Sequence, residues 1–409
     1  MALPLPLSSL RVIDFSRYIA GPFCASILAD LGAEVIRIEP VAGGEDRGLV
    51  PLGDAPDGAL FMQMNRNKKS LAINTKTNEG RDLVERLISS ADVVVTNMPV
   101  DTLRQNALDR ISLQRLRPNI ITVNISAFGP TGRLSERTGF DAIGQALSGA
   151  AYLAGTEGAP ARSSSSYVDY GTGLAGAIGV LAALIQRDAT GKGQDVQASL
   201  LATALTFINV AHIEEAVLGL KREPFGNRSP HSGPSDFFRT KDGTIAVQVV
   251  GERMFARWAK LIGRTDFLQD GRFKDDASRG RYGEHLSLAM REWTLKRTTV
   301  EALQALADAG IPAGPIYSPE QVVSDELVAE TGILGKIGYP GLAAAAPLAE
   351  LIVRLADRDT SIRSRAPLVG EHTDEILRGL GVADAEIERL RRSGIVASTE
   401  LRLSARSAG

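Results

Sequence analysis

The stretch LRVIDFSRYIAGPFCASILADLGAEVIRIE, residues 10–39, decides the fold class of this chain. It contains a short apolar run at 11–15, a helical pattern at 23–31 that Gly32 closes, and a second apolar run at 34–38. Strand, helix and strand joined by tight loops form a βαβ unit, and such units build parallel sheets. The stretch therefore predicts that the first part of the chain is a layered α/β domain.

The same alternation continues after this stretch. Strands are predicted at 70–74, 92–96 and 120–126, with a helix at 79–88 between the first two. Repeated units of this kind give a sheet whose helices cover both faces. The sequence therefore predicts an α/β fold with a Rossmann-like doubly wound sheet in a large domain.

A change of composition marks a second, smaller domain. Residues 221–234 are rich in Pro, Gly, Asn and Ser, and a hairpin followed by amphipathic helices replaces the βαβ pattern after them. We predict a large α/β domain in 1–220, a small α+β domain in 221–325, and a C-terminal part in 326–409. In this last part Thr373 is predicted to cap a helix.

Length, charge and cysteine content narrow the class of protein. The chain has 409 residues, a formal net charge of −2 and one cysteine, Cys24. The charge argues against a general nucleic-acid binder, and a single cysteine fits a reducing compartment. The N-terminal residues lack a secretory-signal pattern, and no run reaches the roughly 18 uninterrupted apolar residues of a membrane span. We predict a soluble, cytoplasmic protein with no nucleic-acid or membrane partner.

A second informative stretch is YVDYGTGLAGAIGVLAALIQR, residues 167–187. Its small residues recur at three- and four-residue spacings, which predicts a buried helix that allows very close packing. Asp169 lies at or just before the N-terminal end of this helix, where the helix dipole favours an ionised carboxylate. From the residues alone, Asp169 is either a helix cap or a reactive group.

The other local motifs are weaker. Residues 171–176 match GxGxxG, but the strand that should precede a dinucleotide site is not evident, so close helix packing is the preferred interpretation. The four histidines show no metal-ligand spacing, so no metal site is predicted, and no GxSxG elbow is present. Basic residues at Arg37 and 65–69 lie near strand ends, where they fit either a phosphorylated ligand or a solvated loop.

Several motifs follow one another in an order known from one family. They are residues 10–39, NRNKKSLAIN at 65–74, ADVVVTNMPVDTLR at 91–104, GFDAIGQALSGA at 139–150, YVDYGTG at 167–173, RDATGKGQDVQASL at 187–200 and LVGEHTDEIL at 368–377. This set spans most of the chain and resembles the class III CoA transferases, which include formyl-CoA transferase and carnitine CoA transferase.

The resemblance implies an architecture. Family members have a dinucleotide-type α/β large domain, which the C-terminal part of the chain completes, and a small domain inserted between. Two subunits thread through each other as interlocked rings, so an obligate homodimer is expected. The composition boundaries near Lys221 and Asp325 agree with that division.

The resemblance also implies a reaction and its nucleophile. The catalytic aspartate of the family falls on Asp169, by the match of the D-x-x-x-G segment. Its carboxylate would attack an acyl-CoA thioester, and an aspartyl anhydride and an aspartyl-CoA thioester would follow before a small carboxylic acid accepts CoA. CoA thioesters enter as substrates, and no cofactor is implied.

Contacts with coenzyme A transfer from the family position by position. They fall on Tyr18, Ile19, Ala20, Ile73, Asn97, Met98 and Arg104. Pro40 stands where formyl-CoA transferase has a basic contact, so Arg37 or Lys68 is expected to substitute for it. Thr138 likewise replaces a family lysine, with Arg137 beside it as a stand-in.

Two alternatives from other classes stay open, a racemase and a non-catalytic CoA-binding protein. The related α-methylacyl-CoA racemases use a histidine in a G-H-D segment, which here reads Gly139-Phe140-Asp141. Phenylalanine cannot transfer a proton, so the substitution disfavours a racemase. The loop Gly226–Gly233 has fewer glycines than its family counterpart. The polar residues of the Ser229–Ser235 loop favour a polar or dicarboxylic acceptor such as succinate, itaconate or mesaconate.

Overall fold

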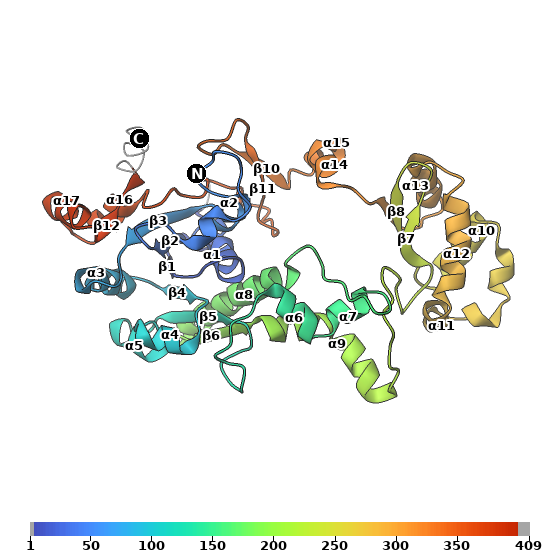
Figure 1. Cartoon of the computed structure of the whole chain (residues 1–409), viewed down its shortest axis with the longest axis horizontal. Helices are drawn as coiled ribbons and strands as arrows, with labels where there is room; N and C mark the ends of the chain where they lie inside the picture. The colour runs from blue at the N-terminus through green and yellow to red at the C-terminus, as the bar shows by residue number, and fades with distance from the viewer. Residues whose placement is uncertain (1–3, 400–409) are drawn as a thin grey trace. The chain divides into compact units, whose positions relative to one another are not determined.

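The computed structural model describes residues 4–399, and these residues divide into two compact units (Figure 1). Unit 1 contains 4–148, Ser163–Asn209 and 327–399. Unit 2 contains Gly149–Arg162 and Val210–Glu326. The small domain predicted for 221–325 lies within unit 2, which also includes a short earlier segment.

Unit 1 is built on a seven-stranded sheet in the order β12-β3-β2-β1-β4-β5-β6. Six of the strands are parallel, and β12 pairs antiparallel with β3 at one edge. The strands are β1 (Arg11–Asp14), β2 (Glu34–Glu39), β3 (Lys68–Ile73), β4 (Val93–Thr96), β5 (Ile121–Ser126), β6 (Asp195–Ser199) and β12 (Val396–Ala397). This order confirms a mixed α/β fold with a parallel sheet, and it reverses direction between β1 and β4.

Successive residues of β1 and β2 pack into two separate hydrophobic cores. In β1, Val12 joins one hydrophobic cluster and Ile13 joins the other, and Val35 and Ile36 of β2 divide in the same way. Side chains of a strand alternate between the faces of a sheet, so both faces need cover. The near-continuous apolar strands of the sequence therefore reflect burial on both sides.

Helices cover both faces of this sheet. The first cluster contains α1 (Ala20–Asp30) and α8 (Tyr167–Thr190), and the second contains α3 (Asn78–Ser89), α16 (Thr373–Gly379) and α17 (Asp384–Arg392). Apart from α9 (Leu200–Leu218), which begins in unit 1, and α15 (Glu326–Glu330), five further short helical segments belong to this unit in the described part of the chain. They are α2 (Ala59–Asn65), α4 (Val100–Gln105), α5 (Arg110–Leu116), α6 (Asp141–Leu147) and the 3₁₀ turn Glu45–Gly48.

The C-terminal part of the chain returns to unit 1 and completes it. The hairpin β10 (Leu334–Ile337) and β11 (Ala346–Ala349) packs with α2 in a small cluster of its own. The predicted capping role of Thr373 is wrong. Thr373 is the first residue of α16, and its buried hydroxyl accepts a hydrogen bond from the Ala72 amide of β3 at 3.2 Å. The hydroxyl therefore joins α16 to the sheet and does not cap the helix.

Unit 2 contains a three-stranded antiparallel sheet covered by helices. Its strands β7 (Ser235–Arg239), β8 (Thr244–Gln248) and β9 (Ala313–Pro315) include the hairpin expected from the sequence. A cluster of buried aromatic and aliphatic side chains fills the space under the helices. These helices are α10 (Glu252–Leu261), α11 (Asp276–Arg281), α12 (Gly283–Thr294), α13 (Thr299–Asp308) and α14 (Pro319–Ser324), and α7 (Ala150–Ala154) also belongs to the unit.

Helix α9 (Leu200–Leu218) differs from the other long helices because most of its apolar side chains are exposed. Phe207, Val210, Ile213 and Val217 each expose more than half of their surface. Among the described residues, α8 and α9 are long and apolar enough to span a membrane by length and composition alone, a criterion that core helices of soluble proteins also meet.

Candidate active site

The loops that follow β1 and β4 meet where the strand order reverses. In parallel sheets this switch point opens a crevice at the carboxyl ends of the strands. Here the Asn97 side chain, just after β4, accepts a hydrogen bond from the Arg17 amide at 3.0 Å and donates one to the Arg17 carbonyl at 2.7 Å. The two loops are thus joined by a reciprocal pair of bonds.

The turn between β1 and α1 is held in an uncommon backbone conformation. Tyr18 has φ of 69°, in the left-handed region that side chains other than glycine rarely adopt. Such a conformation persists only where neighbours enforce it. The Tyr18 amide donates to Asp46 Oδ2 at 3.2 Å, and Asn97 holds the preceding residue. The turn is therefore preorganised, and α1 begins directly after it with no side-chain cap on Ile19.

Close packing of α8 on α1 brings Asp169 toward this turn. A Cβ on Gly173 would lie 2.7 Å from the Ala20 carbonyl oxygen, and one on Gly176 would lie 3.1 Å from Cys24 Sγ. The two helices therefore run side by side in the same direction. Asp169 lies one turn before Gly173 on the same face of α8, so it is placed beside the turn that precedes α1. The glycines serve helix packing, as the sequence indicated.

Asp169 lies in the first turn of α8, and its surroundings disfavour charge. Its exposed fraction is 9%, and no hydrogen bond to its carboxylate is recorded within residues 4–399. Burial, together with the carboxylate of Asp141, raises the pKa of Asp169 to about 7. The pKa shift runs against the direction expected from the helix dipole, because burial and then the charge of Asp141 disfavour ionisation. The amides of Val168 and Asp169 donate to Asp141 Oδ2, at 2.8 and 3.2 Å.

Arg37 and Lys68, expected at the CoA phosphates, lie inside the protein. Lys68 Nζ contacts Asp14 Oδ2 at 2.8 Å, and both side chains are fully buried. Arg37 contacts Asp46 Oδ1 at 2.6 Å and donates to the Ser16 carbonyl at 3.2 Å. In the structure these two cations therefore support the loop after β1, and a phosphate would have to displace their carboxylate partners.

The remaining predicted CoA contacts lie around the same edge of the sheet. Arg104 on α4 is exposed and pairs with Asp101 at 3.1 Å, and Arg137, after β5, is also exposed. Met98 is half-buried after β4, and Ile73 is buried at the carboxyl end of β3. The structure thus joins the Tyr18–Ala20 turn to Asn97 and leaves Arg104 and Arg137 as accessible cations.

Two residues that the sequence analysis did not assign to the site contact it directly. Asp141 caps α8, and Tyr170 packs edge-on against Phe23 with ring centroids 4.8 Å apart. Phe140, the racemase discriminator, is 59% exposed and lies edge-on to Tyr18 at 5.6 Å. The side chain beside this turn is therefore a phenylalanine, which cannot act as a general acid or base. Asp141 lies in the family-like segment 139–150, but its contacts with α8 depend on the tertiary structure.

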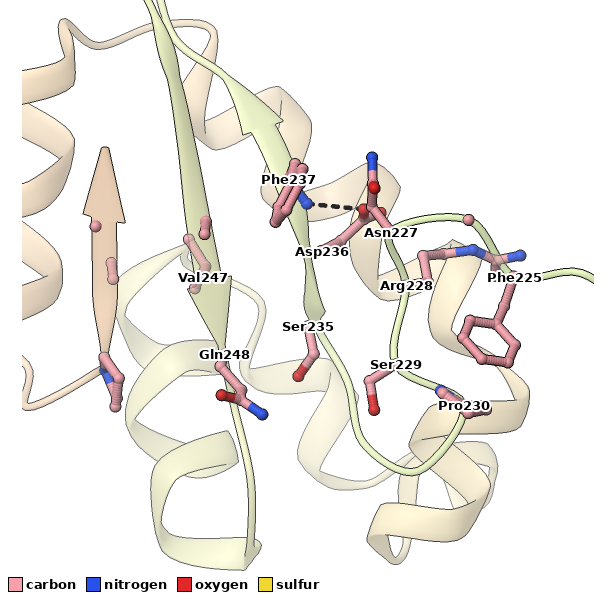
Figure 2. A pocket seen from close by; sticks show the side chains of 15 residues that line it. Phe225, Asn227, Arg228, Ser229, Pro230, Ser235, Asp236, Phe237, Val247 and Gln248 are labelled. Atoms are coloured by element: carbon pink, nitrogen blue, oxygen red, sulfur yellow. Dashed lines mark hydrogen bonds between the residues drawn. The ribbon is translucent and has the colours of Figure 1, made fainter. Parts of the chain in front are cut away.

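Unit 2 has an open pocket of its own, of about 560 Å³. Figure 2 shows that the loop carrying Phe225, Arg228 and Ser229 forms one wall, while Ser235 and Gln248 on β7 and β8 form another. The pocket thus combines the Arg228 guanidinium and the Asp236 carboxylate with hydroxyl and amide groups on a partly apolar surface. The wall includes part of the loop Gly226–Gly233.

Comparison with known proteins assigns the chain to a family. Residues 7–373 match CoA-transferase family III. The succinyl-CoA–L-malate CoA-transferase beta subunit of Chloroflexus aurantiacus is 31% identical over 398 residues, which cover 96% of this chain and 98% of that protein. Mouse succinyl-CoA:glutarate CoA-transferase is also 31% identical, over 97% of this chain and 91% of its own length.

A solved structure agrees with this assignment. The crystal structure of a CAIB/BAIF family protein from Brucella suis superposes with a TM-score of 0.81 at 30% identity, covering 92% of this chain and all of that chain. The chain therefore belongs to CoA-transferase family III, and it is an enzyme, a CoA transferase.

Proposed function

We propose that this enzyme moves CoA from an acyl-CoA donor to a small carboxylic acid, with Asp169 as the nucleophile. One observation carries the proposal. A buried carboxylate with no recorded hydrogen bond among residues 4–399 lies in the first turn of α8, beside the preorganised turn after β1. A carboxyl group with a strongly perturbed pKa in such a place is a functional candidate.

Each step conserves charge and needs no external oxidant, reductant or proton. An Asp169 carboxylate oxygen attacks the thioester carbonyl, the carbon–sulfur bond breaks, and an aspartyl anhydride and CoA thiolate form. The thiolate then attacks the Asp169 carbonyl carbon, which releases the donor acid and leaves an aspartyl-CoA thioester. The acceptor carboxylate attacks this thioester to form a second anhydride. The returning thiolate finally cleaves it to the product acyl-CoA and free Asp169.

Chemical trapping tests the nucleophile. Hydroxylamine added during turnover should convert Asp169 to a hydroxamate, detected by mass spectrometry of the peptide that contains it. Asp169→Ala should lose CoA transfer, since the nucleophile is removed. Asp188→Asn, at the exposed far end of the same helix, is the matched control and should keep activity. Full transfer by Asp169→Ala, or a label found on another residue, contradicts the proposal.

Exchange of an α-proton separates the transferase from the racemase alternative. Wild-type enzyme incubated with a 2-methylacyl-CoA in deuterium oxide should show no deuterium incorporation at the α-carbon, because Phe140 stands at the position of the racemase histidine. Incorporation by the wild type would favour the racemase instead.

For the acceptor we propose a dicarboxylic acid, such as succinate, itaconate or mesaconate. The relatives' names include succinyl-CoA transfers to L-malate and to glutarate, and Arg228 in the unit 2 pocket supplies a cation that suits a carboxylate. A screen of acyl-CoA donors against carboxylic acids, read by mass spectrometry, tests this directly. Activity confined to monocarboxylic acids would refute it.

We further propose that the enzyme is a homodimer, as interlocked family members are. The exposed apolar side chains of α9 support this, because contiguous apolar surface of that kind marks an interface. Light scattering coupled to size-exclusion chromatography should give twice the mass of one chain. A monomer at micromolar concentration would contradict the proposal.

A further inference from the structure

Asp141 forms the N-terminal cap of a helix to which it does not belong. It is the first residue of α6, and its side chain is nearly fully buried. Oδ2 accepts hydrogen bonds from the amides of Val168 and Asp169 at 2.8 and 3.2 Å. Ser166, the residue that precedes α8, makes no side-chain capping bond. Asp141 therefore satisfies donors that the helix would otherwise leave unpaired.

Gln145, one turn later on α6, holds Asp141 in place. Its amide nitrogen donates to Asp141 Oδ1, and its amide oxygen accepts from the Ser163 amide at 2.8 Å. The Asp141–Gln145 pair thus fixes both the first turn of α8 and the segment that leads into it. Such a pair matches the supporting shell that a reactive side chain needs to keep its orientation.

Asp141 is also the charged group that acts on Asp169. The titratable groups facing this helix end are Tyr167 and Tyr170 on α8, Cys24 from α1, Asp141 from α6, and Arg66 behind Tyr170. Arg66 is paired with Asp30 at 2.6 Å. From α9, Thr203 and Phe207 approach without charge. Asp141 is thus a like charge close to Asp169, and within residues 4–399 neither carboxylate forms an ion pair with a cation.

We propose that Asp141 is a positioning residue for the transfer reaction, which orients Asp169 through the first turn of α8 and places a like charge beside it. The inference rests on the proposed role of Asp169 as nucleophile. In the anhydride and in the CoA thioester, Asp169 carries no charge. Acylation therefore relieves its repulsion from Asp141, and the same repulsion raises the pKa and nucleophilicity of the free carboxylate.

The test removes the charge and keeps the two hydrogen bonds from the α8 amides, while the bond that Oδ1 accepts from Gln145 is lost. In Asp141→Asn the amide oxygen can still accept from the two α8 amides. The acid limb of the pH profile of kcat/KM should move to lower pH by about one unit, the lower end of what a neighbouring like charge produces. The fraction of enzyme trapped as aspartyl-CoA thioester at pH 8 should fall by about tenfold, the equivalent of that pKa difference.

Asp109→Asn is the matched control. Asp109 caps α5 by accepting from the Ile111 and Ser112 amides, at 3.0 and 3.2 Å, so the same chemical change is made at a helix end away from Asp169. Its pH profile should be that of the wild type. A wild-type profile and a wild-type level of trapped thioester in Asp141→Asn would overturn the inference.

The two proposals fail separately. If Asp169→Asn is inactive and Asp141→Asn has an unchanged profile, the positioning role is wrong and the nucleophile stands. If Asp169→Asn retains transfer, the proposed function itself is wrong. Should Asp141→Asn not fold, Asp169 can be titrated in the wild type by its carboxylate infrared band, using Asp169→Asn as the reference. A midpoint raised well above the ordinary value of about 4 is expected from burial and the like charge together, and a midpoint near that value overturns the inference.

Discussion

Replacing Asp169 with asparagine should stabilise the protein at pH 8 far more than at pH 5. The pKa of Asp169 is raised from 3.8 to about 7 by burial and by Asp141. Between about pH 3.8 and about pH 7, Asp169 keeps a proton in the folded protein that it has already released in the unfolded chain. Stability therefore falls as pH rises through this window, and the neutral asparagine removes that dependence.

The size of the effect follows from the width of the window. Each unit of pKa difference corresponds to about 1.4 kcal/mol. The range from pH 5 to pH 7 lies between the pKa values of Asp169 in the unfolded and the folded protein. Between pH 5 and pH 8 the free energy of unfolding of the wild type should therefore fall by about 3 kcal/mol relative to that of Asp169→Asn. Other titrating groups cancel because both proteins contain them.

The choice of signal matters in this assay. Both tryptophans, Trp258 and Trp293, lie in unit 2, whereas Asp169 lies in unit 1. Tryptophan fluorescence would report the wrong unit, so urea unfolding should be followed by far-ultraviolet circular dichroism. Asp188→Asn on the exposed end of α8 should show no pH-dependent difference from the wild type. A stability difference for Asp169→Asn that is the same at pH 5 and pH 8 would refute the reasoning.

Three further substitutions test the parts around the site. Gly173→Ala places a Cβ 2.7 Å from the Ala20 carbonyl oxygen, so it should cost about 1–3 kcal/mol in urea unfolding and lower kcat by shifting α8. Lys68→Met leaves the buried Asp14 carboxylate without its cation and should cost about 3–5 kcal/mol, measured in the same way. Asn97→Ala removes the two bonds that hold the turn after β1. It should lower the free energy of unfolding by about 2 kcal/mol, because each lost bond contributes about 1 kcal/mol. It should also raise KM for the acyl-CoA by about tenfold, because the turn is no longer held in place.

Each of these substitutions has its own control. Gly379→Ala puts a Cβ into open space at the end of α16, so it should leave the free energy of unfolding unchanged. If Gly173→Ala is no more destabilising than Gly379→Ala, the packing argument is contradicted. Adding Asp14→Asn to Lys68→Met should recover much of the lost stability, and no recovery would contradict the ion-pair argument. For Asn97→Ala, a lower kcat with unchanged KM would contradict a role in binding.

The sheet was predictable because its signal is local. Apolar runs of four to six residues separated by helical patterns determine β1, β2 and β4, and the predicted strands agree with the observed ones to within two residues. The start of α1 was placed late, at Phe23 instead of Ala20, because Gly21 and Pro22 resemble a turn. Proline is nevertheless compatible with the first turn of a helix, where its missing N–H has no partner to lose.

The candidate site was less predictable because it depends on contacts between distant segments. The sequence placed Asp169 near a helix end, and the dipole argument gave the wrong direction for its charge. Burial of the carboxylate sets that direction, and Asp141, which reaches the same amides from another helix, adds to it. Likewise, Lys68 and Arg37 stood out as a basic cluster, but their partners come from β1 and from a loop that local patterns do not connect to them.

The edge strand β12 is synthesised after all the other strands of its sheet, so it determines when that sheet can be completed. Val396 pairs with Ile73, so the edge of the unit 1 sheet is covered only by residues from the far end of the chain. Unit 2 is complete by Glu326, whereas the outer edge of β3 keeps open backbone groups until residues 396–397 have been synthesised. An uncovered edge strand is a template for pairing with other chains. Nascent chains stalled before Val396 should therefore depend on chaperones, and chains released after it should not.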